Sequence, residues 1–385
     1  MGLTFEPLGK YVRLVDERNT NKVTETVLGI NIDKYFMPSV ANTIGTDLSN
    51  YKLLRKGRFA CNPMHVGRDG RLPVSRYTED APAIVSPAYF MFEIIDENEI
   101  EPEYLMLCFR RPDFDRMCWF RTDASVRGGI TWDDVCALTI PIPSLPEQRK
   151  IVHVYQVITD RIKLLRKMNK NLYQQLFALY DYYCDSADDG EIELGALCQF
   201  QEGYVNPAQT HPEYFDGDVK WLRAVDINES FIIETSRTLT QTGFQSAKKS
   251  AYLFSPNTIA ISKSGTIGRL GIVGDYMCGN RAVINIAPKD PLLLPYIYAF
   301  LKSHQKQFPD LAVGSVQKNL YVSLLEPLPV RILALDSLSE FCNTGNAILN
   351  AVYNNCQENI RLAQLRDTLL PRLMTGELDV SRLTL

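Results

Sequence analysis

Apolar residues recur every seven positions in two long segments of the chain, residues 145–184 and 335–374. A seven-residue apolar period that persists over five heptads is typical of a coiled coil. The sequence therefore predicts two long helices, each with one apolar stripe along its length. We expect the seam between them to contain Ile151, Ile158, Leu165, Leu172 and Leu179 of the first segment, and Phe341, Ile348, Leu362 and Leu369 of the second.

The start of the first helix has a clear signal. Ser144 and, three residues later, Glu147 form a capping-box pattern, and Pro146 suits a first turn. At 1.5 Å per residue such a helix is roughly 60 Å long. A lone amphipathic helix of that length cannot bury its apolar stripe, so we expect the second helix to be its partner. Because a globular stretch separates the two in the sequence, antiparallel pairing about a pseudo-twofold axis is the natural closure.

Polar residues interrupt both apolar stripes at matching positions, Asn169 in the first and Asn359 in the second. A buried Asn in a coiled-coil seam lowers stability but fixes the register of the helices. The other interpretation is that both amides face solvent. The sequence leaves the two interpretations open.

A globular stretch precedes each long helix. Short apolar runs predict strands at residues 58–61, 88–92, 258–261 and 282–286, and longer runs predict helices at 103–114 and 295–308. The expected fold class is α+β, with two similar mixed α/β domains and two long helices in an antiparallel coiled coil. The predicted boundaries are a first domain at 1–143, a central helix at 144–187, a second domain at 188–330, and a C-terminal helix and tail at 331–385.

Four short motifs occur twice, in the same order, at offsets of 186 to 198 residues. Any one match is weak, but four in order are best explained by an internal duplication. The matched pairs are GRDGRL at 67–72 with GTIGRL at 265–270, PEYL at 102–105 with PYI at 295–297, SVR at 125–127 with SVQ at 315–317, and PIP at 141–143 with PLP at 327–329.

Composition is that of an ordinary globular protein, with 45% hydrophobic and 22% charged residues among 385. No signal-peptide pattern and no apolar run of membrane-spanning length occur, so we expect no membrane partner. The nine cysteines form no CxxC pair, which favours reduced, buried thiols and a cytoplasmic location. The four histidines lie far apart, so we expect no metal site.

The net charge is −4, yet two segments at matching places in the repeat are basic. Residues 52–76 contain seven basic residues and one acidic residue, and residues 237–281 contain six and one. A solvated basic face explains one such segment. Two at matching positions favour surfaces that face phosphates.

Motifs for catalysis are missing. The chain has no GxxxxGK[ST] loop and no GxGxxG stretch, so we expect it to bind no nucleotide or other cofactor. Asn62-Pro63-Met64-His65 departs at two positions from the NPP[YF] motif of amino-methyltransferases. We therefore expect no catalytic residues, and a protein that binds and scaffolds.

Three segments carry a resemblance to a known family. PIPSLPEQRKIV at 141–152 resembles the start of the central helix in specificity subunits of type I restriction–modification systems, and LLPRLMTGELD at 369–379 resembles their C-terminal end. SKSGTIG at 262–268 is similar to a strand–loop element of their target-recognition domains. The second repeat departs from the pattern, because residues 331–335 contain no Glu-Gln pair.

The resemblance implies a non-catalytic DNA-recognition subunit. Each target-recognition domain would read one half of a bipartite double-stranded DNA site, and the helices would set the spacer. Two modification subunits would bind S-adenosylmethionine and methylate adenine, and with restriction subunits the assembly would be an ATP-dependent endonuclease. A rival from another class is a coiled-coil adaptor whose two heads bind proteins rather than DNA.

Candidate DNA-binding residues come from the basic segments and the repeated loops. Arg pairs well with guanine and Asn with adenine, while Lys mostly neutralises phosphates. For each candidate, base readout, phosphate contact and plain solvent exposure all remain open, and we expect Trp221 in the core. The candidates are Lys52, Arg55, Lys56, Arg58, Asn62, His65, Arg68, Arg71 and Arg127 in the first domain, and Lys248, Lys249, Lys263, Thr266, Arg269, Asn280 and Arg281 in the second.

Overall fold

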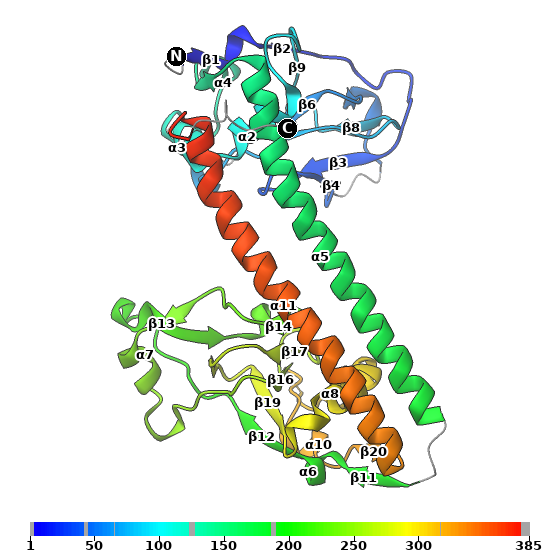
Figure 1. Ribbon diagram of the computed structural model, residues 1–385. Helices are drawn as coiled ribbons and strands as arrows, with labels where there is room; N and C mark the ends of the chain where they lie inside the picture. Colours follow the sequence, from blue (N-terminus) through cyan, green and yellow to red (C-terminus); the bar gives the residue numbers. More distant parts are fainter. Residues whose placement is uncertain are drawn as a thin grey trace. The chain divides into compact units, whose positions relative to one another are not determined.

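The computed structural model describes residues 4–41, 45–64, 66–122, 128–185, 190–315 and 317–378. The chain forms two compact units: unit 1 is Met1–Asp160 with Leu362–Leu385, and unit 2 is Arg161–Arg361. Two long helices, α5 (Leu145–Asp185) and α11 (Leu335–Met374), are each divided between the two units, so that each unit contains one part of both helices (Figure 1). Their bounds agree with those predicted from the heptad pattern. The four-part domain division stays a prediction.

Unit 1 contains two four-stranded sheets and one strand pair. The first sheet is antiparallel throughout. In the second, β3 pairs in parallel with β8. The first has the order β2 (Val12–Leu14), β9 (Phe90–Ile94), β6 (Phe59–Cys61), β7 (Val74–Arg76); the second has β4 (Phe36–Pro38), β3 (Val27–Ile30), β8 (Ala83–Val85), β5 (Lys52–Leu54); and β1 (Thr4–Pro7) pairs with β10 (Thr139–Ile142).

Unit 2 contains a five-stranded sheet, a three-stranded sheet and one strand pair. Here β13 pairs in parallel with β18 and antiparallel with β15. The five-stranded sheet has the order β12 (Cys198–Glu202), β19 (Val283–Pro288), β16 (Thr258–Ser262), β17 (Leu270–Val273), β14 (Phe231–Ile232); the three-stranded sheet has β15 (Thr238–Leu239), β13 (Phe215–Leu222), β18 (Cys278–Gly279); and β11 (Glu191–Glu193) pairs with β20 (Pro329–Arg331).

The two units share one topology. The order β2-β9-β6-β7 in unit 1 corresponds to β12-β19-β16-β17 in unit 2, and β4-β3-β8 corresponds to β15-β13-β18. In both units a strand pair joins the start of the globular part to its end, just before a long helix begins. The predicted duplication and the α+β fold class are therefore confirmed. The units differ in that β5 extends the second sheet of unit 1 and β14 extends the first sheet of unit 2.

Short helices cover the sheets, and two predicted helices have different extents. The helix expected at 103–114 is in fact two, α2 (Pro102–Arg110) and α3 (Pro112–Phe120). Arg111 lies between them in extended conformation because it precedes a proline, which disfavours helical backbone. The helix expected at 295–308 ends earlier, as α8 (Leu294–His304). The remaining short helices are α1 (Val66–Asp69), α4 (Trp132–Cys136), α6 (Leu194–Leu197), α7 (Gln241–Gln245), α9 (Phe308–Leu311) and α10 (Val322–Leu325).

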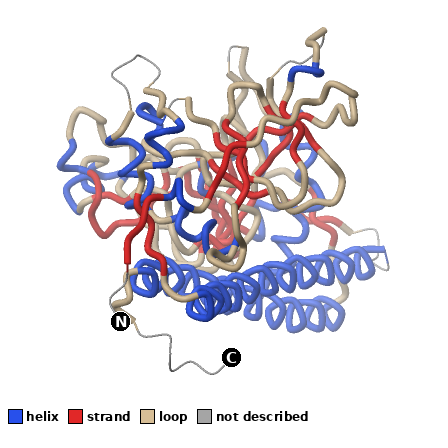
Figure 2. Tube along the Cα trace, turned by 90° about the horizontal axis from the view of Figure 1, so that it is seen from above, coloured by secondary structure: helices blue, strands red, loops and turns tan. Residues whose placement is uncertain are grey.

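Within each unit the parts of α5 and α11 lie side by side and run antiparallel (Figures 1 and 2). In unit 1, the start of α5 at Ile151 packs in one cluster with the end of α11 at Leu370 and Met374. In unit 2, the end of α5 at Tyr180 contacts the start of α11 at Phe341, with ring centroids 6.2 Å apart. Each pair of helix segments also covers its own globular part, so the apolar stripe is sealed on two sides.

The expected seam residues are all at least half-buried. Ile151, Leu165, Phe341 and Ile348 are buried, while Ile158, Leu172, Leu179, Leu362 and Leu369 are half-buried. After Leu165 the most buried line of α5 runs through Tyr173, Leu176 and Tyr180. It shifts because this part of the helix also packs on α8, where Tyr298 lies 5.9 Å from Tyr173 by ring centroid.

Asn169 is buried, and its side-chain oxygen accepts a 2.7 Å hydrogen bond from the Asn355 amide. For Asn169 the structure therefore supports burial over solvent exposure. Its partner is Asn355 and not Asn359, which is half-buried. A paired amide inside an apolar interface favours one alignment of the two helices over shifted ones.

A buried ion pair holds part of unit 1 together. The Lys34 ammonium lies 2.7 Å from Asp115 Oδ1 and also donates to the Phe109 carbonyl, with 5% of the Lys34 side chain exposed. Burial lowers the pKa of Lys34, and the neighbouring Asp115 carboxylate opposes that shift. The same carboxylate oxygen accepts the Leu72 backbone N–H at 3.1 Å. The pair therefore fastens the segments around residues 34 and 72 to α2 and α3.

We predict that Lys34→Met lowers the free energy of unfolding by about 3–5 kcal/mol, because it removes the ion-pair partner of a buried carboxylate. Denaturant unfolding of the full chain measures the change. The control is Lys34→Met with Asp115→Asn, which removes both charges and keeps an acceptor for Leu72. It should recover most of the loss, and a single variant as stable as the wild type would contradict the assigned role.

Candidate nucleic-acid interface

In unit 1 the candidate lysines and arginines that the structure describes are already paired with carboxylates. Lys52 points inward: its ammonium donates to the Tyr89 carbonyl at 2.7 Å and lies 3.7 Å from Asp16. Burial lowers the pKa of Lys52. The other ion pairs are Arg55 and Arg58 with Glu17, Lys56 with Asp80, Arg68 with Asp69, and Arg71 with Asp33.

Most of these carboxylates come from outside the basic segment. Glu17 precedes Arg55 by 38 residues and Asp33 precedes Arg71 by the same interval, so a local count of charges missed them. The pKa of Glu17 is lowered, chiefly by the hydrogen bond from Arg55. Exposed ion pairs stabilise a fold by at most about 1 kcal/mol. The outer cations of unit 1 can therefore exchange a carboxylate for a phosphate at small cost, whereas Lys52 cannot.

The repeated glycine loop of unit 1 is pinned to the segment near Gly128. The Gly67 backbone N–H donates to the Gly128 carbonyl at 2.8 Å, and the Trp119 indole donates to the Gly67 carbonyl at 3.0 Å. A Cβ added to Gly67 would lie 2.9 Å from the Gly128 Cα, so no larger residue fits. Nearby, the Asn62 side chain accepts the Met64 backbone N–H. The candidates His65 and Arg127 lie outside the described residues.

In unit 2 the structure brings three candidates together, Lys263, Asn280 and Arg281. The Lys263 backbone N–H donates to the Ala282 carbonyl at 2.7 Å, and the Asn280 backbone N–H donates to the Leu222 carbonyl at 2.9 Å. The Arg281 backbone N–H donates to Asn206 Oδ1 at 3.3 Å. These contacts join the segment after β12 to the ends of β13 and β18.

Lys263 has a carboxylate and an aromatic partner. Its ammonium lies 2.8 Å from Glu202 and 4.7 Å from the centroid of the Tyr321 ring. Tyr204 donates to the same Glu202 carboxylate at 3.3 Å. Arg281 is exposed, and within the described part of the chain no carboxylate lies within ion-pair distance of it. Of these two side chains, Arg281 is the freer to contact a ligand.

The remaining candidates of unit 2 are Lys248, Lys249, Thr266 and Arg269. Lys248 and Lys249 are exposed, and over the described ranges neither has a carboxylate within ion-pair distance. Thr266 is exposed, and its carbonyl accepts the Ser262 hydroxyl. Arg269 lies near Glu229, whose pKa is lowered chiefly by the hydrogen bond from Lys302 and further by Arg269.

Two arginines near the end of β13 were not among the candidates. The Arg237 guanidinium lies 4.3 Å from the centroid of the Phe215 ring, and that of Arg223 lies 5.4 Å from Trp221. Trp221 itself is core, as expected, with 5% exposed and its indole donating to the Val205 carbonyl. The sequence signal was an arginine just outside each of two strands, which is visible only once the strands are placed.

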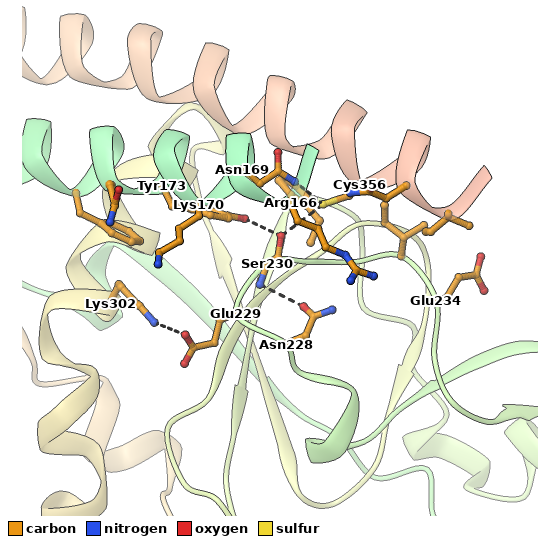
Figure 3. A pocket seen from close by; sticks show the side chains of 16 residues that line it. Arg166, Asn169, Lys170, Tyr173, Asn228, Glu229, Ser230, Glu234, Lys302 and Cys356 are labelled. Atoms are coloured by element: carbon orange, nitrogen blue, oxygen red, sulfur yellow. Dashed lines mark hydrogen bonds and ion pairs between the residues drawn. The ribbon is translucent and has the colours of Figure 1, made fainter. Parts of the chain in front are cut away.

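A cavity of about 600 Å³ lies within unit 2, between α5, α11 and residues 228–234 (Figure 3). Its wall contains a Tyr173–Ser230 hydrogen bond and a Lys302–Glu229 ion pair. Arg166 and Lys170, one turn apart on α5, also line it. The hydrogen-bonded groups join both long helices to the globular part of unit 2, so we assign the cavity wall a structural role.

No group of three or more His, Cys, Asp or Glu that could hold a metal ion occurs in the part of the chain that the structure describes. All nine cysteines are free thiols, seven of them buried. Across the described residues, no helix combines the length and the apolar character that a membrane span needs.

Comparisons with known proteins agree with this architecture. Residues 189–336 match a family described as the type I restriction modification DNA specificity domain. The HindI specificity subunit of Haemophilus influenzae is 23% identical, over 96% of this chain and 98% of the length of that subunit. The MjaIX specificity subunit of Methanocaldococcus jannaschii is 24% identical over 75% of this chain and 72% of its own.

A solved structure has the same fold. The S subunit of a type I restriction-modification system from M. genitalium matches with a TM-score of 0.57 and 16% identity, over 97% of this chain and 96% of that one. The relatives are named specificity subunits, in agreement with the expectation that this chain is not the catalytic one. Residues 189–336 therefore match the type I restriction modification DNA specificity domain, and nearly the whole chain is similar to specificity subunits of these systems.

Proposed function

We propose that each globular domain reads one half of a bipartite DNA site and that the long helices set the spacer between the halves. The recognition domains would be residues 1–143 and 188–330, and the helical segments would be 144–187 and 331–385. The observation that carries the proposal is the shared strand order of the two units, each joined to parts of the same two helices. One topology with two different sets of surface residues is suited to reading two different sequences.

The proposal assigns the chemistry to partners. This chain would dock two modification subunits that methylate adenine, and restriction subunits would join them in the cytoplasm. Methylation of a base inside a duplex requires the base to be extruded into a pocket. Neither repeat contains a cofactor motif for that step, so the chain would supply position and sequence choice only.

One observation favours the rival function, an adaptor whose heads bind proteins. The exposed candidate cations of unit 1 already pair with Glu17, Asp33, Asp69 and Asp80, so that head presents less free positive charge than its sequence suggests. DNA binding requires exchange of these pairs for phosphates. DNA binding that depends both on salt and on the sequence of the duplex separates the two functions.

We predict that the complex of this chain with its modification subunits binds duplex DNA with an affinity that falls steeply with salt. Release of about six phosphate counterions would weaken binding on the order of a thousandfold between 50 and 200 mM salt. Fluorescence anisotropy with a labelled duplex measures the slope. An adaptor would show either no DNA binding or none that depends on the sequence of the duplex.

A second prediction tests the spacer. Inserting seven residues after Lys167 in α5, with a matching heptad beside Asn355 in α11, preserves the heptad register and adds about 10 Å of helix. That is roughly three base pairs at 3.4 Å each. Methylome sequencing of cells that carry the variant should show the same half-sites with a spacer about three base pairs longer.

The control for this prediction is the heptad inserted in α5 alone. It leaves Asn169 beside Asn355 but offsets the unit 1 part of α5, so Ile151 no longer lies against Leu370 and Met374 and methylation should be lost. Altered half-sites in the doubly lengthened variant, or an unchanged spacer, would refute the assignment of the helices.

A further inference from the structure

Three arginines of unit 2 lie at the same end of the strands in the sheet β15-β13-β18. Arg223 follows the end of β13, and Arg281 follows the end of β18 by two residues. Because β13 and β18 are parallel, their carboxyl-terminal ends lie side by side at one end of the sheet. Arg237 precedes β15, which is antiparallel to β13 with Thr238 opposite Lys220, so it lies at that end too. We call Arg223, Arg237 and Arg281 the arginine edge.

Arg237 is held in place without a neutralising partner. Its guanidinium lies 4.3 Å from the centroid of the Phe215 ring and 6.0 Å from that of Trp221, and it donates to Gln209 Oε1 at 3.0 Å. Among the residues that the structure describes, no carboxylate lies within ion-pair distance of it. Stacking occupies a face of the guanidinium plane, so N–H groups along its edge remain free to donate.

Arg223 has a supporting position. It donates to the Ser236 hydroxyl at 2.6 Å and lies 3.7 Å from Asp226, which in turn accepts from Ser236. This network fixes the residue directly before Arg237. We therefore treat Arg223 as a positioning residue.

Arg281 has a fixed backbone and an exposed side chain. Asn206 accepts its backbone N–H, and the preceding Asn280 is bonded to the Leu222 carbonyl. A Cβ added to Gly203 would meet the Asn280 carbonyl oxygen at 2.2 Å, so the two segments are as close as backbone allows. The arginine edge thus presents two cationic forks, Arg237 and Arg281, from rigid supports.

The corresponding edge of unit 1 has different chemistry. There β3 and β8 end and β4 begins, and the adjoining residues are Asn31, Ser86 and Tyr35. Tyr35 is 52% exposed, and Asn31 Oδ1 accepts the Asp33 backbone N–H. None of these three residues is an arginine. One structural position therefore carries different hydrogen-bonding groups in the two units, as reading two different sequences requires.

We propose that the residues at this end of the sheet contact the base pairs of DNA in both domains, and that Arg237 is a specificity-determining residue that recognises guanine in the second half-site. The inference rests on the proposed function. A planar arginine with free N–H groups matches the O6 and N7 acceptors of guanine in the major groove. Arg281 is placed to read a second guanine or the adjoining phosphate.

The test uses the complex with modification subunits and the site found by methylome sequencing of the wild type. Binding is measured by fluorescence anisotropy on that duplex and on duplexes with each base pair of either half-site replaced. Arg237→Met keeps an apolar stem over Phe215 and removes the charge. Arg237→Lys keeps the charge and removes the planar fork. Lys306→Met, at an exposed site outside the arginine edge, is the matched control.

Both Arg237 variants should lose roughly 10- to 100-fold discrimination at one G·C pair of the second half-site, because one bidentate contact is gone. Discrimination at the first half-site should not change, and Lys306→Met should match the wild type. Arg237→Lys should keep the salt dependence of the DNA affinity unchanged. Arg237→Met should make that dependence less steep only if the guanidinium also neutralises a phosphate. Thermal unfolding checks that each variant is folded. If Arg237→Met does not fold, the loss of discrimination is tested with Arg237→Lys alone.

Full discrimination by the folded Arg237→Met variant, or by both Arg237 variants, would mean that Arg237 reads no base, and it would overturn the inference while leaving the proposed function intact. Loss of discrimination at the first half-site instead would overturn the assignment of domains to half-sites. Failure of the wild-type complex to select any bipartite site would overturn the proposed function itself.

Discussion

The structure depends on the burial of two apolar helix stripes that cannot be buried alone. In each unit, α5 and α11 bury their apolar stripes against one another and against the globular part of that unit. Ile151 packs with Met374 in unit 1, and Tyr180 contacts Phe341 in unit 2. Full burial of such a side chain is worth about 1.5–3 kcal/mol. Unit 1 combines Met1–Asp160 with Leu362–Leu385, so its two helix parts come from opposite ends of the chain, whereas unit 2 is the continuous stretch Arg161–Arg361.

Polar groups inside this packing add specificity to its stability. The hydrogen bond from Asn355 satisfies the side-chain oxygen of the buried Asn169, and a shifted alignment would break it. Lys34 and Asp115 act similarly in unit 1, where a buried charge pair fixes loops against α2 and α3. In both places the physical cost of burying polar groups selects one arrangement over its near neighbours.

The DNA recognition that we propose would involve competition between carboxylates of the chain and phosphates of the DNA. In unit 1 exposed cations pair with carboxylates of the same unit, so phosphate contacts require exchange. In unit 2, Arg237 and Arg281 have no such partner over the described residues, and their positions are held by an aromatic ring and a backbone contact. The shared topology therefore carries two surfaces with different electrostatics.

The sequence predicted the elements that depend on local pattern. Helix bounds at Leu145 and Leu335 followed from the heptads and the Ser144 cap, and the duplicated motifs predicted a repeated topology. The break at Arg111 also has a local signal, the proline that follows it, and the helix predicted at 103–114 wrongly continued through that proline.

Tertiary structure alone decided which charges are free. Glu17 lies 38 residues from Arg55, and Phe215 lies 22 residues from Arg237, so no local window contains both members of either contact. The arginine edge exists because parallel β13 and β18 end together, and the order of strands in a sheet is fixed by long-range packing. Periodicity and turn chemistry are properties of neighbouring residues, whereas the pairing of charges and the alignment of strand ends are properties of the folded chain.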